Sequence, residues 1–380
     1  MTGVGLVGAG WMGHLHARAY SRLPHHVALA DRPRLVAVAD AVAAAADDFV
    51  ARYGFGRATT DWRSVVDDPA VEAVSVAAPN GLHREIGVAV AQAGKHLWIE
   101  KPVGLTSADT AAVAQAVHAA GVTSTIGFNY RMVPAIARAR RLLAEGAIGR
   151  LTHARFRLLT DFAAHPDGGL SWRFTRAQGG SGVLNDLAVH GVDLIRFLVG
   201  EPRTVVADGE RFIPRRPVVA AGASQYSRGG DVYGDVENLD YVSVLGRTAD
   251  DVLVQLEASR VAVGDQNDYG FEIHGTQGLV SFDFRRPGEL LVSSGDGYVD
   301  QASSVVAAAP GDGDFALFQP GAGNPTSLDD LKVSEANAFL RGVAGGEVAP
   351  GATIDDALAA ARVLDAVAQS MDKRGWVDLA

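Results

Sequence analysis

The sequence predicts an α/β protein whose N-terminal part is a doubly wound parallel sheet and whose C-terminal part is an α+β domain with a large, mostly antiparallel open sheet. Two observations predict this architecture. Up to residue 127, short apolar strands alternate with helical patterns, which is typical of doubly wound folds. Beyond it the strands become longer and more alternating, with hairpin-like spacing. We therefore expect two domains, at residues 1–127 and 128–380.

Composition narrows the function classes before any motif is considered. The chain has 380 residues, 48% of them hydrophobic, which is enough for two cores of ordinary size. A net charge of −10 argues against nucleic acid or an anionic membrane as a partner and favours a small molecule. The absence of cysteine excludes disulfides, thiolate nucleophiles and cysteine-ligated zinc. Without a signal-peptide pattern or a long apolar run, we expect a cytoplasmic protein.

The first predicted strand runs into the glycine-rich motif Gly8-Ala9-Gly10-Trp11-Met12-Gly13, and a helical pattern follows. The first glycine permits a tight turn, the second lets a pyrophosphate approach the backbone, and the third lets helix and strand pack closely. The helix N-terminus then faces the phosphates. We interpret the motif as the dinucleotide fingerprint of a Rossmann domain rather than as an ordinary glycine-rich turn. The residues expected to contact the cofactor here are Gly8, Gly10, Trp11, Met12 and Gly13.

An acid at the end of the second strand completes this fingerprint, and Asp40 supplies it. The spacing is longer than usual, so Asp31 competes for the role, but Asp31 precedes the strand instead of ending it. Asp40 could also be the N-cap of the helix that follows. Its carboxylate would accept hydrogen bonds from a ribose diol and repel a 2′-phosphate, and Ala41-Val42-Ala43 offers no base. The sequence therefore predicts NAD in preference to NADP.

The next strand ends in a turn at the same sheet edge as the glycine motif. The turn residues Ala78, Pro79 and Asn80 could lie against a cofactor ribose or the nicotinamide. His83 follows, either as a ligand contact or as a first-turn helix residue bonded to backbone. Further strands are expected at 97–100 and 122–127, and helices at 81–93 and 107–120.

The strand at 97–100 ends in Glu100-Lys101-Pro102, an acid, a base and a helix breaker. Ligands of open parallel sheets bind beyond the carboxyl ends of the strands, so this pair is expected to face the cofactor crevice. The alternative is a surface ion pair, which contributes little to stability.

These motifs resemble those of the glucose-fructose oxidoreductase / inositol dehydrogenase (Gfo/Idh/MocA) family. The resemblance extends over essentially the whole chain. It is carried by the glycine motif, by Pro79-Asn80 with His83, by Gly94-Lys95-His96 leading into Glu100-Lys101-Pro102, and by Gly127-Phe128-Asn129-Tyr130-Arg131. It implies that Lys101 lies beside the nicotinamide and the substrate. Glu100 is expected among the cofactor-binding residues because of its position at the strand end.

One helix stands out in the second half, expected from about 183 to 199 after Gly179-Gly180-Ser181-Gly182. Asp186, His190 and Asp193 form an acidic-histidine stripe on it, apart from its apolar face. An aspartate beside a histidine can orient the imidazole as a proton carrier. A solvated helix face is the alternative, and a metal site is disfavoured because a third ligand at a typical spacing is lacking.

The same helix carries the second signature of the family, so the resemblance implies that Asp186 and His190 join Lys101 as the catalytic set. Ala188 stands where many members have glycine. The resemblance also assigns Trp172 and Arg173 to the nicotinamide or substrate. The candidates for hydrogen bonds to a polyol are Tyr130, Asp161, Asn185, Asp186, His190 and Lys101.

The rest of the chain is expected to support the site. Loops at 214–234 and 293–325 have compositions that argue against regular structure, and the first is expected to influence substrate choice. Helices at about 328–343 and 354–371 are expected to be structural. The exposed sheet, together with the family resemblance, predicts a homodimer or homotetramer.

The combined interpretation is an NAD(P)-dependent oxidoreductase that exchanges a hydride between nicotinamide and a secondary hydroxyl or keto group of a sugar, sugar derivative or inositol. His190 would take the hydroxyl proton, Asp186 would hold the ring, and Lys101 would bind the reacting oxygen. Two alternatives stay open: an NAD-dependent glycosidase that oxidises its sugar transiently, and a non-catalytic sugar or dinucleotide sensor.

Overall fold

The computed structural model describes residues 1–28, 32–219 and 227–379, which form two compact units. Unit 1 contains Met1–Met132, Leu317–Pro320 and Thr326–Leu358, and unit 2 contains Val133–Ala316, Gly321–Pro325 and Ala359–Ala380. The expected domain boundary after residue 127 lies close to the end of the first stretch of unit 1, and it stays a prediction. Asp31, the alternative ribose ligand, lies outside the described residues.

Unit 1 is built on a parallel sheet with the strand order β3-β2-β1-β4-β5-β6. Its strands are β1 (Gly3–Val7), β2 (Arg34–Ala39), β3 (Arg57–Thr59), β4 (Ala73–Val76), β5 (His96–Ile99) and β6 (Ser124–Ile126). The order reverses between β1 and β4, which is where doubly wound sheets form their ligand crevice. The predicted doubly wound domain is confirmed.

The helices of unit 1 cover both faces of this sheet. They are α1 (Trp11–His26), α2 (Ala43–Tyr53), α3 (Arg63–Val66), α4 (Asn80–Gln92), α5 (Ser107–Ala120), the short η1 (Asn129–Met132) and α10 (Leu328–Val343). Helix α1 packs against α2 and α10, and α4 packs against α5.

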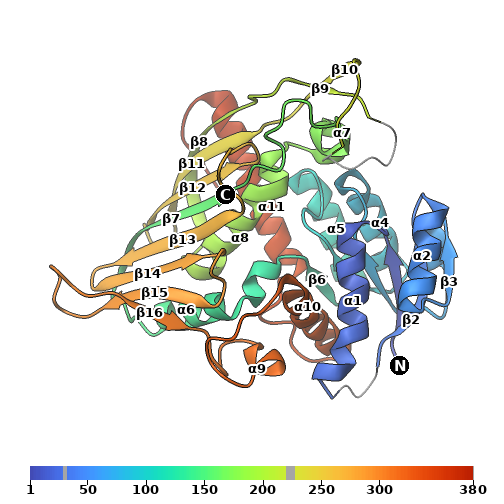
Figure 1. Ribbon diagram of the computed structural model, residues 1–380, viewed down its shortest axis with the longest axis horizontal. Coiled ribbons are helices and arrows are strands. Elements are labelled where there is room, and N and C mark those ends of the chain that lie inside the picture. Colours follow the sequence, from blue (N-terminus) through green and yellow to red (C-terminus); the bar gives the residue numbers. More distant parts are fainter. Residues whose placement is uncertain (29–31, 220–226, 380) are drawn as a thin grey trace. The chain divides into compact units, whose positions relative to one another are not determined.

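Helix α10 comes from far along the chain but packs along α1 (Figure 1). It begins with a capping box in which Ser327 and Asp330 satisfy each other's backbone amides. Its Phe339 joins Trp98 of β5 and Tyr20 of α1 in one buried apolar cluster. The helix expected at about 328–343, which the sequence assigned to the second domain, therefore belongs to the core of unit 1.

Unit 2 contains a nine-stranded sheet with the order β16-β15-β14-β13-β7-β12-β11-β8-β17 (Figure 1). The strands are β7 (Leu151–Leu159), β8 (Pro202–Glu210), β11 (Tyr241–Thr248), β12 (Leu253–Ser259), β13 (Asp268–Gly275), β14 (Gly278–Asp283), β15 (Glu289–Ser294), β16 (Ser304–Ala307) and β17 (Val377–Asp378). Strand β12 pairs with β7 in parallel, and the other neighbours are antiparallel. The predicted open, mostly antiparallel sheet is confirmed.

Helices pack on one face of this sheet. Unit 2 holds α6 (Pro134–Ala144), the short η2 (Trp172–Phe174), α7 (Arg176–Gly179), the π turn η3 (Leu184–Ala188) and α8 (Val189–Leu198), while α9 (Phe315–Phe318) and α11 (Ile354–Lys373) include residues of both units. Helix α8 contacts β7 and β12, and α6 contacts β14 and β15. No helix within the described ranges is long and apolar enough to cross a bilayer.

The other face of the sheet carries a continuous row of side chains across eight strands. Strand pairing aligns Val206, Leu245, Gln255, Arg155, Glu272, Ser281, Leu291 and Val305 in that order. The two central charges form a bidentate ion pair, with both N···O distances 2.8 Å. Leu245, Leu291 and Val305 are exposed, the last by 62%. This open face therefore presents apolar side chains to its surroundings.

The loop expected at 214–234 contains regular structure that its composition did not predict. Strand β9 (Arg215–Pro217) pairs with β10 (Tyr233–Asp235) in a small antiparallel sheet. The buried Arg216 explains this, because its guanidinium donates to the carbonyl oxygens of Ala163 and His165 and stacks 4.3 Å from the ring of Phe174. Residues 220–226 of this loop lie outside the described ranges.

Candidate active site

The glycine motif forms a tight turn between β1 and α1. Gly8 has a φ of +102°, and a Cβ there would lie 2.5 Å from the carbonyl oxygen of Ala77. A Cβ at Gly13 would lie 2.0 Å from the carbonyl oxygen of Gly8, so only glycine lets the helix approach this closely. Gly10 is the N-cap of α1 and faces open space. The helix N-terminus is therefore accessible to a phosphate, as NAD requires.

Asp40 directly follows β2 and is tied to the glycine motif. Its Oδ2 accepts a hydrogen bond from the Ala9 amide at 2.8 Å, and its Oδ1 accepts one from the Val42 amide at 2.9 Å. Each carboxylate oxygen keeps acceptor capacity for a ribose hydroxyl. The helix N-cap is Val42, so Asp40 is not the cap that the alternative interpretation proposed.

The turn after β4 lies at the same sheet edge, and His83 connects it to the next strand end. Pro79 is the N-cap of α4 and Asn80 its first residue. The ring of His83 is 1% exposed, with Nε2 2.7 Å from the carbonyl oxygen of Ala78 and Nδ1 2.7 Å from that of Pro102. His83 is thus bonded to backbone, as one of its two interpretations expected, and its contact with the cofactor stays a prediction.

Glu100 and Lys101 follow β5 but occupy different environments. Glu100 is 5% exposed, and its carboxylate contacts His16 and Lys332 in the interior of unit 1, so a surface ion pair is excluded. Lys101 is partly exposed. The expectation that Glu100 contacts the cofactor stays a prediction, whereas the position of Lys101 at the carboxyl end of β5 suits a group that meets a ligand.

In unit 2, Asp186 lies in a π turn where the sequence predicted a regular α-helix. The turn η3 precedes α8, and its N-cap is Val183. The amide of Val183 donates to the carbonyl oxygen of Leu239, and Asn185 Oδ1 accepts from the amide of Ser181 at 2.7 Å. Such π turns are frequent at functional sites because they redirect one side chain of a helix.

The acidic-histidine stripe is largely buried. His190 is 7% exposed and Asp193 1%, while Asp186 is partly exposed. This burial rules out the solvated helix face as an explanation of the pattern. Within the described ranges, no cluster of three His, Cys, Asp or Glu side chains could hold a metal ion. An aspartate and a histidine at this spacing are suited to proton transfer, and the catalytic role of Asp186 and His190 stays a prediction.

A buried polar cluster that sequence analysis missed supports this region. Arg260 donates to Asp240 Oδ1 and to Asn238 Oδ1, both at 2.8 Å, and these three residues are at most 3% exposed. Burial lowers the pKa of Arg260, and attraction to Asp240 and to Asp186 opposes that shift. An arginine and an aspartate twenty positions apart follow no pattern that would predict this contact.

The same cluster fixes the turn that carries Trp172 and Arg173. Asn238 Nδ2 donates to the carbonyl oxygen of Arg173 at 2.9 Å, and the guanidinium of Arg173 stacks 4.3 Å from the ring of Trp172. Asp161 follows β7 in unit 2 and Tyr130 lies in η1 of unit 1, and both are partly exposed. Their contacts with a substrate stay predictions, as do those of Trp172 and Arg173.

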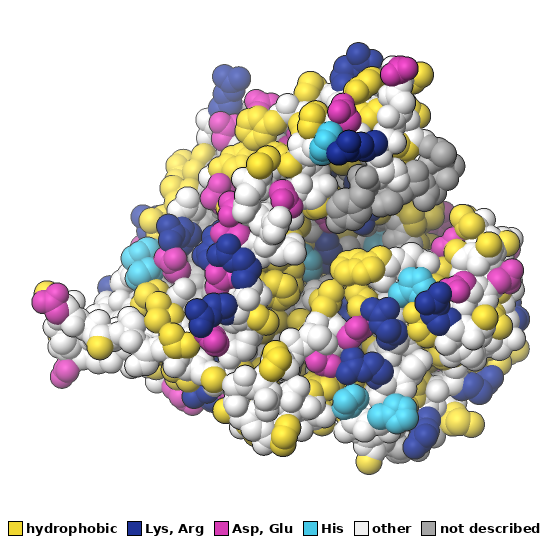
Figure 2. Space-filling model, in the orientation of Figure 1, with side chains coloured by type: hydrophobic (Ala, Val, Ile, Leu, Met, Phe, Trp, Pro, Cys, Tyr) yellow, Lys and Arg dark blue, Asp and Glu magenta, His cyan; other side chains and the backbone are white. Residues whose placement is uncertain are grey.

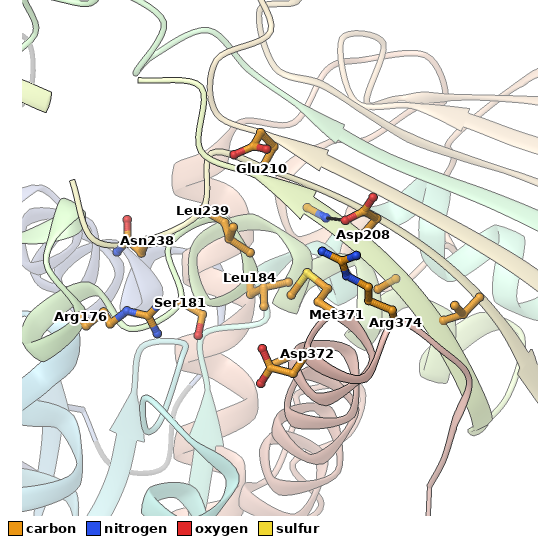
Figure 3. Close-up of a pocket in the computed structure, with 14 residues that line it drawn as sticks. Arg176, Ser181, Leu184, Asp208, Glu210, Asn238, Leu239, Met371, Asp372 and Arg374 are labelled. Carbon is orange, nitrogen blue, oxygen red and sulfur yellow. Dashed lines mark hydrogen bonds between the residues drawn. The ribbon is translucent and has the colours of Figure 1, made fainter. Parts of the chain in front are cut away.

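A pocket of about 820 Å³ lies beside the π turn in unit 2 (Figure 3). Leu184 of η3, Asp208 of β8 and Asp372 of α11 line it, together with Arg176 and Arg374. Asp186 and His190 do not line this pocket, so it reaches the start of the π turn without including the candidate catalytic side chains.

The geometry of the glycine motif and of Asp40 is typical of a dinucleotide-binding domain. Together with the candidate site in unit 2, it indicates an oxidoreductase. Residues 2–128 match the model of an oxidoreductase family with an NAD-binding Rossmann fold, and residues 136–281 match the GFO/IDH/MocA C-terminal domain. The chain belongs to the Gfo/Idh/MocA family of NAD-dependent oxidoreductases. The predicted family and fold class are confirmed.

Similar proteins cover the full length of the chain. Levoglucosan dehydrogenase from Pseudarthrobacter phenanthrenivorans is 38% identical over 99% of this chain and 97% of its own. Inositol 2-dehydrogenase from Rhizobium meliloti is 29% identical over 99% and 98%. A structure of levoglucosan dehydrogenase in complex with NADH and levoglucosan superposes with a TM-score of 0.92 at 36% identity, covering 100% of this chain and 99% of that one.

Proposed function

We propose that this protein is an NAD-dependent dehydrogenase that oxidises a secondary hydroxyl of a sugar, sugar derivative or inositol, with an anhydrosugar such as levoglucosan as the first candidate. The observation that carries the proposal is full-length similarity to a levoglucosan dehydrogenase in a chain that has Lys101, Asp186 and His190. All three residues match the pattern that proton abstraction from a hydroxyl requires.

In the proposed reaction, His190 takes the proton of the reacting hydroxyl. Asp186, at the π turn one helical turn earlier, orients the imidazole and stabilises its protonated form. Lys101 donates a hydrogen bond to the substrate oxygen as negative charge develops on it. Bound NAD⁺ supplies the hydride acceptor. Tyr130, Asp161 and Asn185 are proposed to bind further hydroxyls, and Trp172 with Arg173 the substrate or the nicotinamide.

We further propose that NAD is preferred over NADP. Asp40 is held at the glycine motif by the Ala9 amide, where its charge would meet a 2′-phosphate. The next residues, Ala41-Val42-Ala43, provide no positive charge to offset that repulsion.

A homodimer or homotetramer is proposed to form through the open face of the sheet in unit 2. Figure 2 shows hydrophobic side chains gathered over the strands β8 and β11, where Leu245 is 38% exposed. Burying such a row against a second copy removes apolar surface from water. Light scattering on the wild type and on Leu245→Arg tests this, and a monomeric wild type would contradict it. The cytoplasmic location stays a prediction from the sequence.

The function is tested by incubating the purified protein with NAD⁺ and a panel of levoglucosan, inositols, aldoses and glycosides while following the absorbance of reduced nicotinamide. We expect NADH formation with at least one free polyol or anhydrosugar. Cleavage of a glycoside without net NADH formation would instead indicate a redox-assisted glycosidase. Saturable binding of NAD and sugar without any turnover would indicate a sensor.

A further inference from the structure

Four ionisable side chains meet in the interior of unit 1, next to the end of β5. They are His16 of α1, Glu100, and Lys332 and Glu335 of α10. Glu100 is 5% exposed and the other three are 0% exposed. Charges are buried in a protein at a high cost unless they are paired and hydrogen-bonded. The geometry of the group therefore decides which charges it can hold.

Glu100 is bound by side chains of two helices. Lys332 Nζ lies 2.5 Å from Glu100 Oε1 and 2.6 Å from Glu335 Oε2, so one ammonium group serves both carboxylates. His16 Nε2 lies 2.9 Å from the same Glu100 oxygen, and its ring stacks 3.7 Å from that of Trp98. The carboxylate is thus fixed from α1 and from α10 at once.

The protonation states make Lys332 the positive member of the group. Burial lowers the pKa of His16 to about 4, so its imidazole is neutral at physiological pH despite the contact with Glu100. Burial raises the pKa of Glu100, but attraction to Lys332 and the hydrogen bond from His16 hold that pKa well below its ordinary value. Burial also lowers the pKa of Lys332, and the two carboxylates raise it above the ordinary value.

The backbone around Glu100 leaves its side chain little freedom. The amide of Glu100 donates to the carbonyl oxygen of Val76, and the amide of Gly127 donates to that of Ile99, both at 2.9 Å. A Cβ at Gly127 would lie 2.4 Å from Glu100 Oε2, so the carboxylate fills the space that a larger residue would need. Lys101 is the next residue along the chain, so it directly follows this fixed strand end.

We propose that Lys332 is a positioning residue for Lys101: it holds the buried carboxylate of Glu100, and through it the strand end from which the Lys101 side chain reaches the substrate. The proposal rests on the proposed role of Lys101. A misplacement of about 1 Å at a reacting group can reduce turnover by about 10²-fold, so loss of this anchor should affect chemistry more than cofactor binding.

The test compares Lys332→Met with the matched control Glu335→Gln, which changes a buried charge one turn further along the same helix and leaves the pair of Lys332 with Glu100 intact. We expect Lys332→Met to lower kcat by about 10- to 100-fold at nearly unchanged affinity for NAD, and Glu335→Gln to keep most of the turnover. The double variant Glu100→Gln/Lys332→Met should recover part of the loss, because it leaves no unpaired carboxylate at position 100.

A second measurement tests the pairing of Lys332 with Glu100 without relying on enzyme activity. In Lys332→Met, His16 faces an unneutralised Glu100 and should titrate closer to neutrality by NMR, whereas in the double variant it should return toward its wild-type value. This titration distinguishes failure of the positioning role from failure of the proposed enzymatic function. If Lys332→Met does not fold, Lys332→Gln, which keeps a hydrogen-bond donor, replaces it with the same expected direction. Full turnover in a folded Lys332 variant, or equal losses in the Lys332 and Glu335 variants, would overturn the proposal.

Discussion

Replacing His16 with glutamine should remove part of the sensitivity of unit 1 to acid. The buried imidazole has a pKa lowered to about 4, whereas in the unfolded chain it returns to 6.5. The unfolded state therefore takes up a proton first as the pH falls. The stability contributed by the neutral ring is fully present above pH 6.5 and is lost as the pH falls toward about 4.

The magnitude follows from the interval between the two pKa values. Each pKa unit corresponds to about 1.4 kcal/mol, so the full effect is about 3.5 kcal/mol, of which roughly 2 kcal/mol falls between about pH 7 and pH 5. That window lies above the ordinary titration range of a glutamate, so Glu100 contributes little to it. His16→Gln keeps a hydrogen-bond donor for Glu100 but cannot titrate.

The assay is urea unfolding of wild type and His16→Gln across this pH range. On going from about pH 7 to pH 5, the wild type should lose roughly 2 kcal/mol more unfolding free energy than His16→Gln does. His83, whose pKa is also lowered by burial, is common to both proteins and cancels in the comparison. If both proteins lost stability in parallel, the neutral buried imidazole would be refuted.

Three further predictions concern the cofactor and the proton path. Asp40→Ser should narrow the preference for NAD over NADP in kcat/KM, and a wild type that works better with NADP would contradict the role given to Asp40. His190→Ala should lower turnover by about 10²- to 10⁴-fold at nearly unchanged NAD affinity, with near-normal turnover arguing for a different base. Asp186→Asn should lower turnover less than His190→Ala does if Asp186 only orients the ring, and by a comparable factor if its charge stabilises the imidazolium. Steady-state kinetics of the two variants would distinguish these roles.

The turn of the glycine motif and the position of Asp40 beside it could be predicted, because each depends on residues that are close together along the chain. Gly8 and Gly13 are required by the turn and by the approach of α1 to it, within one short stretch of chain. Asp40 stands at the end of a predicted strand, and the end of the apolar run in the sequence shows where that strand stops. Local requirements of this kind produce motifs with a fixed spacing, which can be recognised in a single sequence.

The supporting contacts could not be predicted, because they join residues that are distant along the chain. Lys332 reaches Glu100 across 232 positions, and no pattern in either segment signals the other. The residue before the π turn also has a distant partner, because the amide of Val183 donates to the carbonyl oxygen of Leu239. Similarly, the buried guanidinium of Arg216 stabilises β9, although the composition of the surrounding sequence predicted a loop there.

The most direct measurement of the central claim is NADH formation by the wild type and by Lys101→Met, with levoglucosan and inositols as substrates. We predict turnover by the wild type and a loss of about 10²- to 10⁴-fold in Lys101→Met, with NAD binding retained in both. A wild type that binds NAD but reduces none of it with any sugar or polyol would contradict the assignment as a dehydrogenase, and equal turnover by the two proteins would contradict the role of Lys101.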